Sequence, residues 1–141
     1  MNEVKPTISR WHIGNAISAV TLALFVIILT TVVGDGDERR MAFTFGQYGL
    51  SVALLWGSYA VLVRRSSFGT AMLSMAWAAG LGFYFALYMV LGSLPPSLVQ
   101  EGQRGAVVFI GLLLLWCVIG CVVAAIGFTQ NNNKMRAAQG Q

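Results

Sequence analysis

Hydrophobic positions in this chain fall into four long runs that are separated by short polar segments. The runs cover roughly residues 13–33, 41–63, 68–94 and 106–128. Each run is longer than about 18 residues, the length at which an apolar stretch predicts a membrane-spanning helix. The pattern therefore predicts an all-α fold: an integral membrane bundle of four transmembrane helices with short loops.

The polar segments around these runs are too short to form a second domain. Residues 1–12 are predicted to be a cytoplasmic N-terminal segment, and residues 13–128 the transmembrane domain. Residues 129–141 lack apolar periodicity, which predicts a flexible cytoplasmic tail. The four-residue link 64–67 predicts that the second and third spans are antiparallel neighbours.

Basic residues favour one orientation of the four predicted spans. Six of the nine lie on the side of both termini, and three lie on the opposite side. Because Lys and Arg concentrate on the cytoplasmic side of membrane proteins, both termini are predicted to be cytoplasmic. We expect a multi-pass protein of the cell membrane, with the bacterial inner membrane as its location. The six are Lys5, Arg10, Arg64, Arg65, Lys134 and Arg136, and the three are Arg39, Arg40 and Arg104.

The composition supports a membrane environment. Hydrophobic residues make up 57% of the chain and charged residues 10%, whereas about 25% of a soluble domain is charged. The net charge of +4 is spread over residues that flank the spans and form no dense basic run. Because a basic cluster is the usual footprint of nucleic-acid binding, we expect membrane lipids and no nucleic acid as partners.

Polar side chains in the first span are uncharged. Ion-coupled carriers hold an ionisable residue at membrane depth, and the four-helix small multidrug transporters carry an acidic residue in their first span. This chain has Asn15, Ser18 and Thr21 there instead, so we identify no resemblance to that family. The three side chains predict either hydrogen bonds to a neighbouring helix or to their own backbone, or the lining of a polar cavity.

No arrangement of residues in the sequence is typical of an enzyme, a metal centre or a bound cofactor. His12 stands alone beside Trp11, without the second axial ligand of a haem held between spans. Cys117 and Cys121 have no second Cys or His pair for zinc, so we interpret them as small packing residues. The acidic segment 34–40 is shorter than the calcium loop of about twelve residues. We expect no catalytic, cofactor-binding or metal-binding residues.

Small residues recur every third or fourth position on three of the predicted spans. Such series let helix backbones approach each other closely in lipid, so they predict helix-packing faces. The candidates are Gly49, Ala53 and Gly57 in the second span, Ser74, Ala78, Gly82 and Ala86 in the third, and Cys117, Gly120, Cys121 and Ala124 in the fourth.

A second stripe on the third span is aromatic. Trp77, Tyr84 and Tyr88 lie close together on a helical wheel. Apolar walls with a few polar groups are typical of lipophile sites, so the stripe predicts contact with a lipid tail or a quinone. The alternative is helix packing at Trp77 and an interfacial aromatic belt at Tyr84 and Tyr88.

These features favour a small multi-pass membrane protein that is not an enzyme. We expect a non-catalytic accessory subunit or assembly factor that packs against the transmembrane helices of other chains, or against further copies of itself. The alternative is a permeability element, either a holin-like oligomeric pore or a carrier of an apolar or lipidic substrate. The dense small-residue faces favour the accessory subunit.

Overall fold

Four helices make up the computed structural model, which describes residues 9–33, 41–93 and 101–138. They are α1 (Arg10–Val33), α2 (Met41–Leu62), α3 (Ser67–Gly92) and α4 (Glu101–Ala138). The described residues contain no strand. The predicted all-α class is therefore confirmed.

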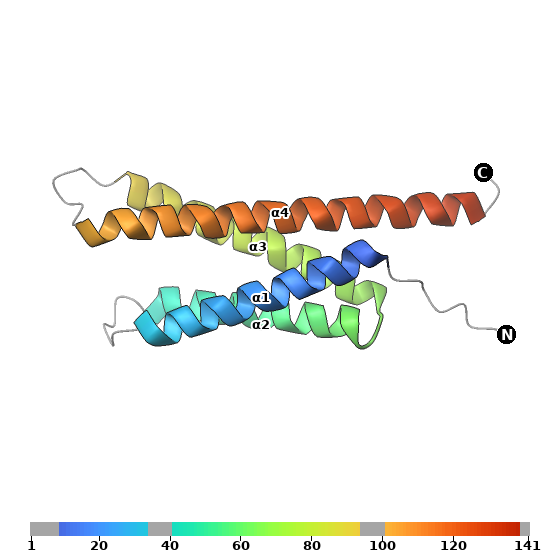
Figure 1. Ribbon diagram of the computed structural model, residues 1–141, viewed down its shortest axis with the longest axis horizontal. Helices are drawn as coiled ribbons and strands as arrows, with labels where there is room; N and C mark the ends of the chain where they lie inside the picture. Colours follow the sequence, from blue (N-terminus) through green and yellow to red (C-terminus); the bar gives the residue numbers. More distant parts are fainter. Residues whose placement is uncertain (1–8, 34–40, 94–100, 139–141) are drawn as a thin grey trace.

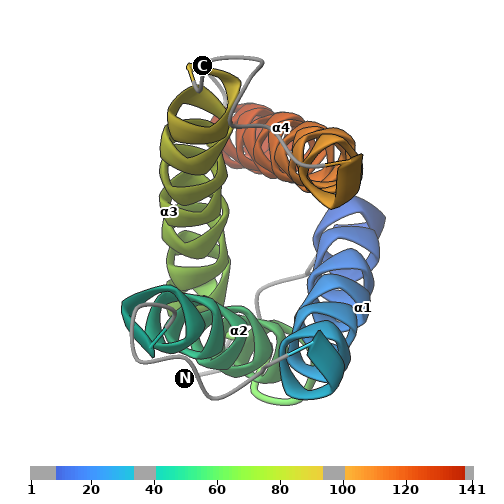
Figure 2. The same cartoon turned by 90° about the vertical axis from the view of Figure 1, so that its left-hand side faces the viewer.

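The helices form a ring in chain order (Figures 1 and 2). Each packs along the next one, and α1 closes the ring against α4 over a less extensive interface than the others. In Figure 2, α3 lies across the ring from α1. The seam between α1 and α4 is therefore the loosest of the four joints.

The link between α2 and α3 is tightly built. Ser66 caps α3, and its Oγ accepts a hydrogen bond of 3.2 Å from the backbone N–H of Phe68. Arg65 has a φ of 49°, in the left-handed region that few non-glycine residues occupy. Gly69 lies against the backbone of Ala60, where a Cβ would come within 2.8 Å. The predicted antiparallel pairing of these helices is confirmed.

The core of the bundle is apolar and includes one large aromatic packed on a glycine. Trp77 and Tyr84 of α3 are the largest fully buried side chains, each 0% exposed. The Trp77 indole lies against Gly120 of α4, where an added Cβ would collide with the ring. Cys117, one turn earlier on α4, is also fully buried and borders Gly80. The contact between α3 and α4 thus depends on the absence of a side chain at position 120.

Three helices are long and apolar enough to cross a membrane. Their apolar segments are Arg10–Thr31 in α1, Phe68–Gly92 in α3 and Gly105–Gln130 in α4. α2 is not among them, and Gln47, Ser51 and other polar residues lower its hydropathy. The crossing of the membrane by all four helices stays a prediction.

The last helix is longer than the sequence pattern predicted. α4 begins at Glu101 and continues to Ala138, whereas the fourth span was expected to cover 106–128. The helix therefore continues through most of the segment that was predicted to be a tail, and the flexibility of residues 129–141 stays a prediction. Extending an existing helix requires no apolar stripe, since each added residue gains one backbone hydrogen bond.

Replacement of Gly120 by alanine is expected to destabilise the bundle. The new methyl group would collide with Trp77 and force α3 and α4 apart, at about 1–3 kcal/mol. Gly105→Ala in the same helix is the control, because a Cβ there meets no atom within 4 Å. Thermal unfolding in detergent should show a lower midpoint for Gly120→Ala, whereas the midpoint of Gly105→Ala should not be lowered. Equal midpoints would contradict the tight packing at Gly120.

Candidate functional site

A groove runs along the seam between α1 and α4, and it consists of two adjoining cavities. The first has a volume of about 420 Å³ and the second about 480 Å³. Ile119 of α4 lines both, so the two lie next to each other at that residue. Both volumes fall in the range of about 300–1,000 Å³ that is usual for small-molecule sites.

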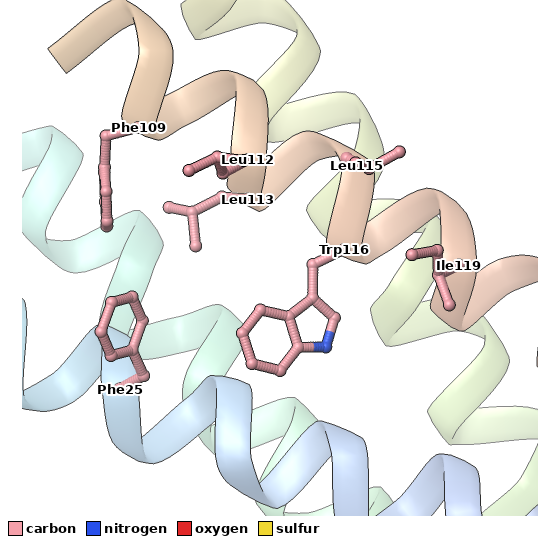
Figure 3. A pocket seen from close by; sticks show the side chains of 7 residues that line it. All are labelled: Phe25, Phe109, Leu112, Leu113, Leu115, Trp116 and Ile119. Carbon is pink, nitrogen blue, oxygen red and sulfur yellow. The ribbon is translucent and has the colours of Figure 1, made fainter. Parts of the chain in front are cut away.

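The first cavity is apolar, and aromatic side chains from both helices form it (Figure 3). Phe25 of α1 faces Phe109 of α4 with ring centroids 5.8 Å apart. The Trp116 ring extends from α4 toward α1. The complete lining is Phe25, Phe109, Leu112, Leu113, Leu115, Trp116 and Ile119.

One hydrogen bond crosses the groove near the junction of its two halves. The indole N–H of Trp116 donates to Oγ of Ser18 over 2.9 Å and ties α4 to α1. The sequence had left three roles open for Asn15, Ser18 and Thr21, and the structure separates them. Ser18 bonds to a neighbouring helix, whereas Thr21 donates to the carbonyl of Ile17 in its own helix.

The second cavity is polar at the end near the start of α1. Asn15 lines it, is only 4% exposed, and its Oδ1 has no hydrogen-bond partner in the described part of the chain. Such a buried, unpaired carbonyl oxygen is costly and favours a donor from water or a ligand. The complete lining is Arg10, Trp11, Gly14, Asn15, Ser18, Ile119, Gly120 and Val123.

Polar side chains between α1 and α2 mostly satisfy each other. Thr30 of α1 donates a hydrogen bond to Oε1 of Gln47 in α2, and both are buried. Ser58 of α2 donates to the carbonyl of Ala16 over 3.1 Å and to that of Leu54 over 2.7 Å. This interface therefore holds polar atoms inside the bundle without leaving an open site.

Four further polar atoms are buried without a partner among the described residues. They are Nδ1 of His12, Oγ of Ser51, Nε1 of Trp77 and the hydroxyl of Tyr84. None of these residues lines either cavity of the groove. Their burial lowers the stability of the bundle unless water satisfies them.

The aromatic stripe predicted on α3 is divided by the fold. Trp77 and Tyr84 are 0% exposed, and Tyr88 is 39% exposed. The alternative that places Tyr84 in an interfacial aromatic belt is therefore wrong, because the Tyr84 ring packs inside the bundle. None of the three lines the groove, so contact of this stripe with a lipophile stays a prediction without a described cavity.

The predicted helix-packing residues fall into three groups. Those that are buried hold the bundle together, as Gly57 shows by lying against the backbone of Leu73. Those that are exposed make no close contact within the chain: an added Cβ at Gly49 or Gly82 would meet nothing within 4 Å. Gly57, Cys117, Gly120 and Ala124 are buried, Ala53, Ser74 and Cys121 are half-buried, and Gly49, Ala78, Gly82 and Ala86 are exposed.

The described residues offer no cluster for metal chemistry. No group of three or more His, Cys, Asp or Glu side chains comes together among them. Cys117 and Cys121 are free thiols within α4. The imidazole of His12 lies against Gly127, where its Nε2 would be 3.0 Å from an added Cβ. The groove between α1 and α4 can bind a small molecule through its shape and its hydrogen-bonding groups.

For Asn15 and Ser18 the sequence predicted the lining of a polar cavity as one alternative, but it did not single out the aromatic and aliphatic residues of the groove, although a weak signal was present. Phe109 and Trp116 are seven residues apart on α4, and Ser18 and Phe25 are seven apart on α1. Residues at this spacing lie on one face of a helix. Large apolar residues are common in every span, so this spacing indicates a groove only when α1 and α4 are known to be neighbours.

Substitution of Ser18 by alanine is expected to loosen the seam. The Trp116 indole would lose its acceptor, and such bonds between helices in lipid are worth about 0.6 kcal/mol on average. Ser74→Ala is the control, because its hydroxyl donates to the carbonyl of Thr70 in its own helix. Thermal unfolding should show a larger loss for Ser18→Ala than for Ser74→Ala. The reverse order would contradict a bond that joins the two helices.

Comparison with protein-family models, with curated proteins and with solved structures finds no match for this chain.

Proposed function

We propose that this chain is a four-span protein of the cell membrane, with both termini cytoplasmic, that acts as a non-catalytic accessory subunit. In this proposal the outer face of α3 docks on a transmembrane helix of a partner chain. The expected location is the bacterial inner membrane. The observation that carries the proposal is the open space over Gly82 in the middle of that face.

The distribution of polar residues supports α2 as the remaining span. Gln47, Ser51 and Ser58 are each at most 4% exposed, so the polar side chains that lower its hydropathy point into the bundle. Its outer face instead carries large side chains such as Phe45 and Trp56. At 22 residues, α2 is about 33 Å long, enough for a hydrocarbon core of about 30 Å.

The outer face of α3 is flat where other helices are ridged. No large hydrophobic side chain is exposed between Met75 and Phe85, and the exposed residues of that interval are Ala78, Ala79 and Gly82. On α4, by contrast, large hydrophobic side chains are exposed at almost every turn, including Val108, Leu112, Leu115, Ile119, Val122 and Ile126. In lipid, a small-residue surface lets a second helix approach closely and gain van der Waals contact. The flat face therefore favours a partner helix over lipid chains.

The same distribution disfavours the holin-like pore. A pore assembled from several copies needs polar side chains on the faces where the copies meet water. The polar residues of α1 and α2, such as Asn15, Thr30 and Gln47, are buried inside one copy. The faces open to neighbours are predominantly apolar, which suits contact with helices or lipid.

Reporter fusions test the topology. A reporter placed after Gly36 and one placed after Gln141 should report opposite sides of the membrane, because three spans lie between these two points in the four-span layout. In four spans, residue 36 follows the first and residue 141 follows the fourth. A further fusion after Arg65 should agree with the one at Gln141. Agreement of Gly36 with Gln141 would contradict the layout.

Site-specific photocrosslinking tests the docking face. A benzoylphenylalanine at Met75, which is 72% exposed beside the flat face, should give a discrete adduct with a partner chain in membranes. The same probe at Leu112 of α4 should give none. Gly82→Leu should abolish the adduct by filling the open face. Gly49→Leu is the matched control, because Gly49 is an equally open glycine on α2.

Three outcomes would contradict the partner helix. Adducts with lipid alone would leave the face without a protein partner. An adduct with the mass of two copies would assign the face to self-association. An adduct that survives Gly82→Leu would place the contact away from the flat face.

A further inference from the structure

The groove between α1 and α4 is amphipathic along its length. Its first cavity is apolar, and its second contains a cation, an amide and a hydroxyl near the start of α1. The order along α1 is Arg10, Asn15, Ser18 and then Phe25. At about 1.5 Å per residue these positions extend over roughly 20 Å. The groove thus has the polarity profile of a single-chain lipid.

The cation at the polar end has no ionic partner among the residues that the structure describes. Arg10 is exposed and forms no ion pair within the described residues. The acidic residue among them, Glu101, begins α4 at the opposite end of the seam, because α4 runs antiparallel to α1. An anionic group at this end would therefore meet Arg10 without competition from a described carboxylate. A guanidinium is well suited to bind a phosphate through paired N–H groups.

The next two positions offer one acceptor and one donor. Oδ1 of Asn15 is an unpaired acceptor on a residue that is 4% exposed. Ser18 accepts the Trp116 N–H, and its own hydroxyl proton is donated to no described acceptor. Thr21, Thr30 and Ser58 differ, since each donates to the carbonyl four residues earlier in its helix. A ligand with a hydroxyl followed by a carbonyl would satisfy both Asn15 and Ser18.

We infer that the groove binds a single-chain anionic glycerophospholipid of the lysophosphatidate type. The phosphate pairs with Arg10, the free glycerol hydroxyl donates to Oδ1 of Asn15, and the ester carbonyl accepts from Ser18. The acyl chain lies between Phe25 and Phe109 in the apolar cavity. The sequence of chemical groups in this lipid matches the sequence of side chains along α1.

Native mass spectrometry of the detergent-purified full chain tests the inference with four probes. Oleoyl lysophosphatidate should be retained at about tenfold lower concentration than oleoyl lysophosphatidylcholine, whose choline competes with Arg10 for the phosphate. Oleate, which lacks the glycerol hydroxyl, should bind more weakly than lysophosphatidate. Glycerol 3-phosphate should not displace the lipid, because it lacks the chain that the apolar cavity holds.

Variants locate the lipid. Arg10→Gln and Asn15→Leu should each weaken lysophosphatidate binding by about tenfold, and Arg65→Gln, an arginine outside the groove lining, should leave it unchanged. Ile119→Trp should block binding by bulk, since Ile119 lines both cavities and is 53% exposed, so the larger ring disturbs no core packing.

The inference would be overturned by several results. Equal retention of the two lysolipids, or unchanged binding in Arg10→Gln and Asn15→Leu, would remove headgroup recognition. Unchanged binding in Ile119→Trp would place the lipid outside the groove. Displacement by glycerol 3-phosphate would assign the polar end to a free phosphoglycerol, and no retention of any probe would leave the groove without this ligand.

Discussion

Trp77 of α3 packs against Gly120 of α4, and this contact determines how the rest of the bundle is arranged. The indole needs the space that a glycine leaves, so α4 approaches α3 closely at this level. The other side of Gly120 borders the cavity between α4 and α1. A single residue without a side chain therefore permits the tight joint with α3 and contributes to the open joint with α1.

The sequence predicted the helices well because length and hydropathy decide them locally. It also identified small residues that pack inside the bundle, such as Gly57 and Gly120. A helical wheel, however, shows which residues share a face of one helix, but it does not show which face contacts the neighbouring helices. The stripe through Gly82 was recognised, but its exposure on the outside of α3 required the positions of the other helices. Tyr84 illustrates the same limit, since its buried position depends on neighbouring helices.

The candidate groove was less accessible to sequence reasoning, because α1 and α4 are far apart in the chain. Ser18 and Trp116 are separated by 98 positions, yet they share the hydrogen bond that crosses the seam. Neither residue type is unusual in a membrane span. For Asn15 the sequence predicts either a hydrogen bond within the bundle or the lining of a polar cavity, and the choice between the two requires its unpaired Oδ1 and the cavity beside it. The extension of α4 was missed because hydropathy marks where a helix leaves an apolar environment and not where it ends.

The two outward-facing features of the bundle lie on different sides of the ring. α3, which carries the flat face, lies on one side of the ring, and the junction of α1 and α4 lies on another (Figure 2). A helix docked over Gly82 would therefore leave the groove uncovered, and a lipid in the groove would not occupy the docking face. Trp77 and Gly120 connect α3 to the wall of the groove and so offer one direct route for coupling between the two surfaces. A close-packed contact of this kind transmits small displacements, because neither the ring nor the backbone beside it has room to yield. The same contact that shapes the bundle thus provides the shortest physical link between its two surfaces.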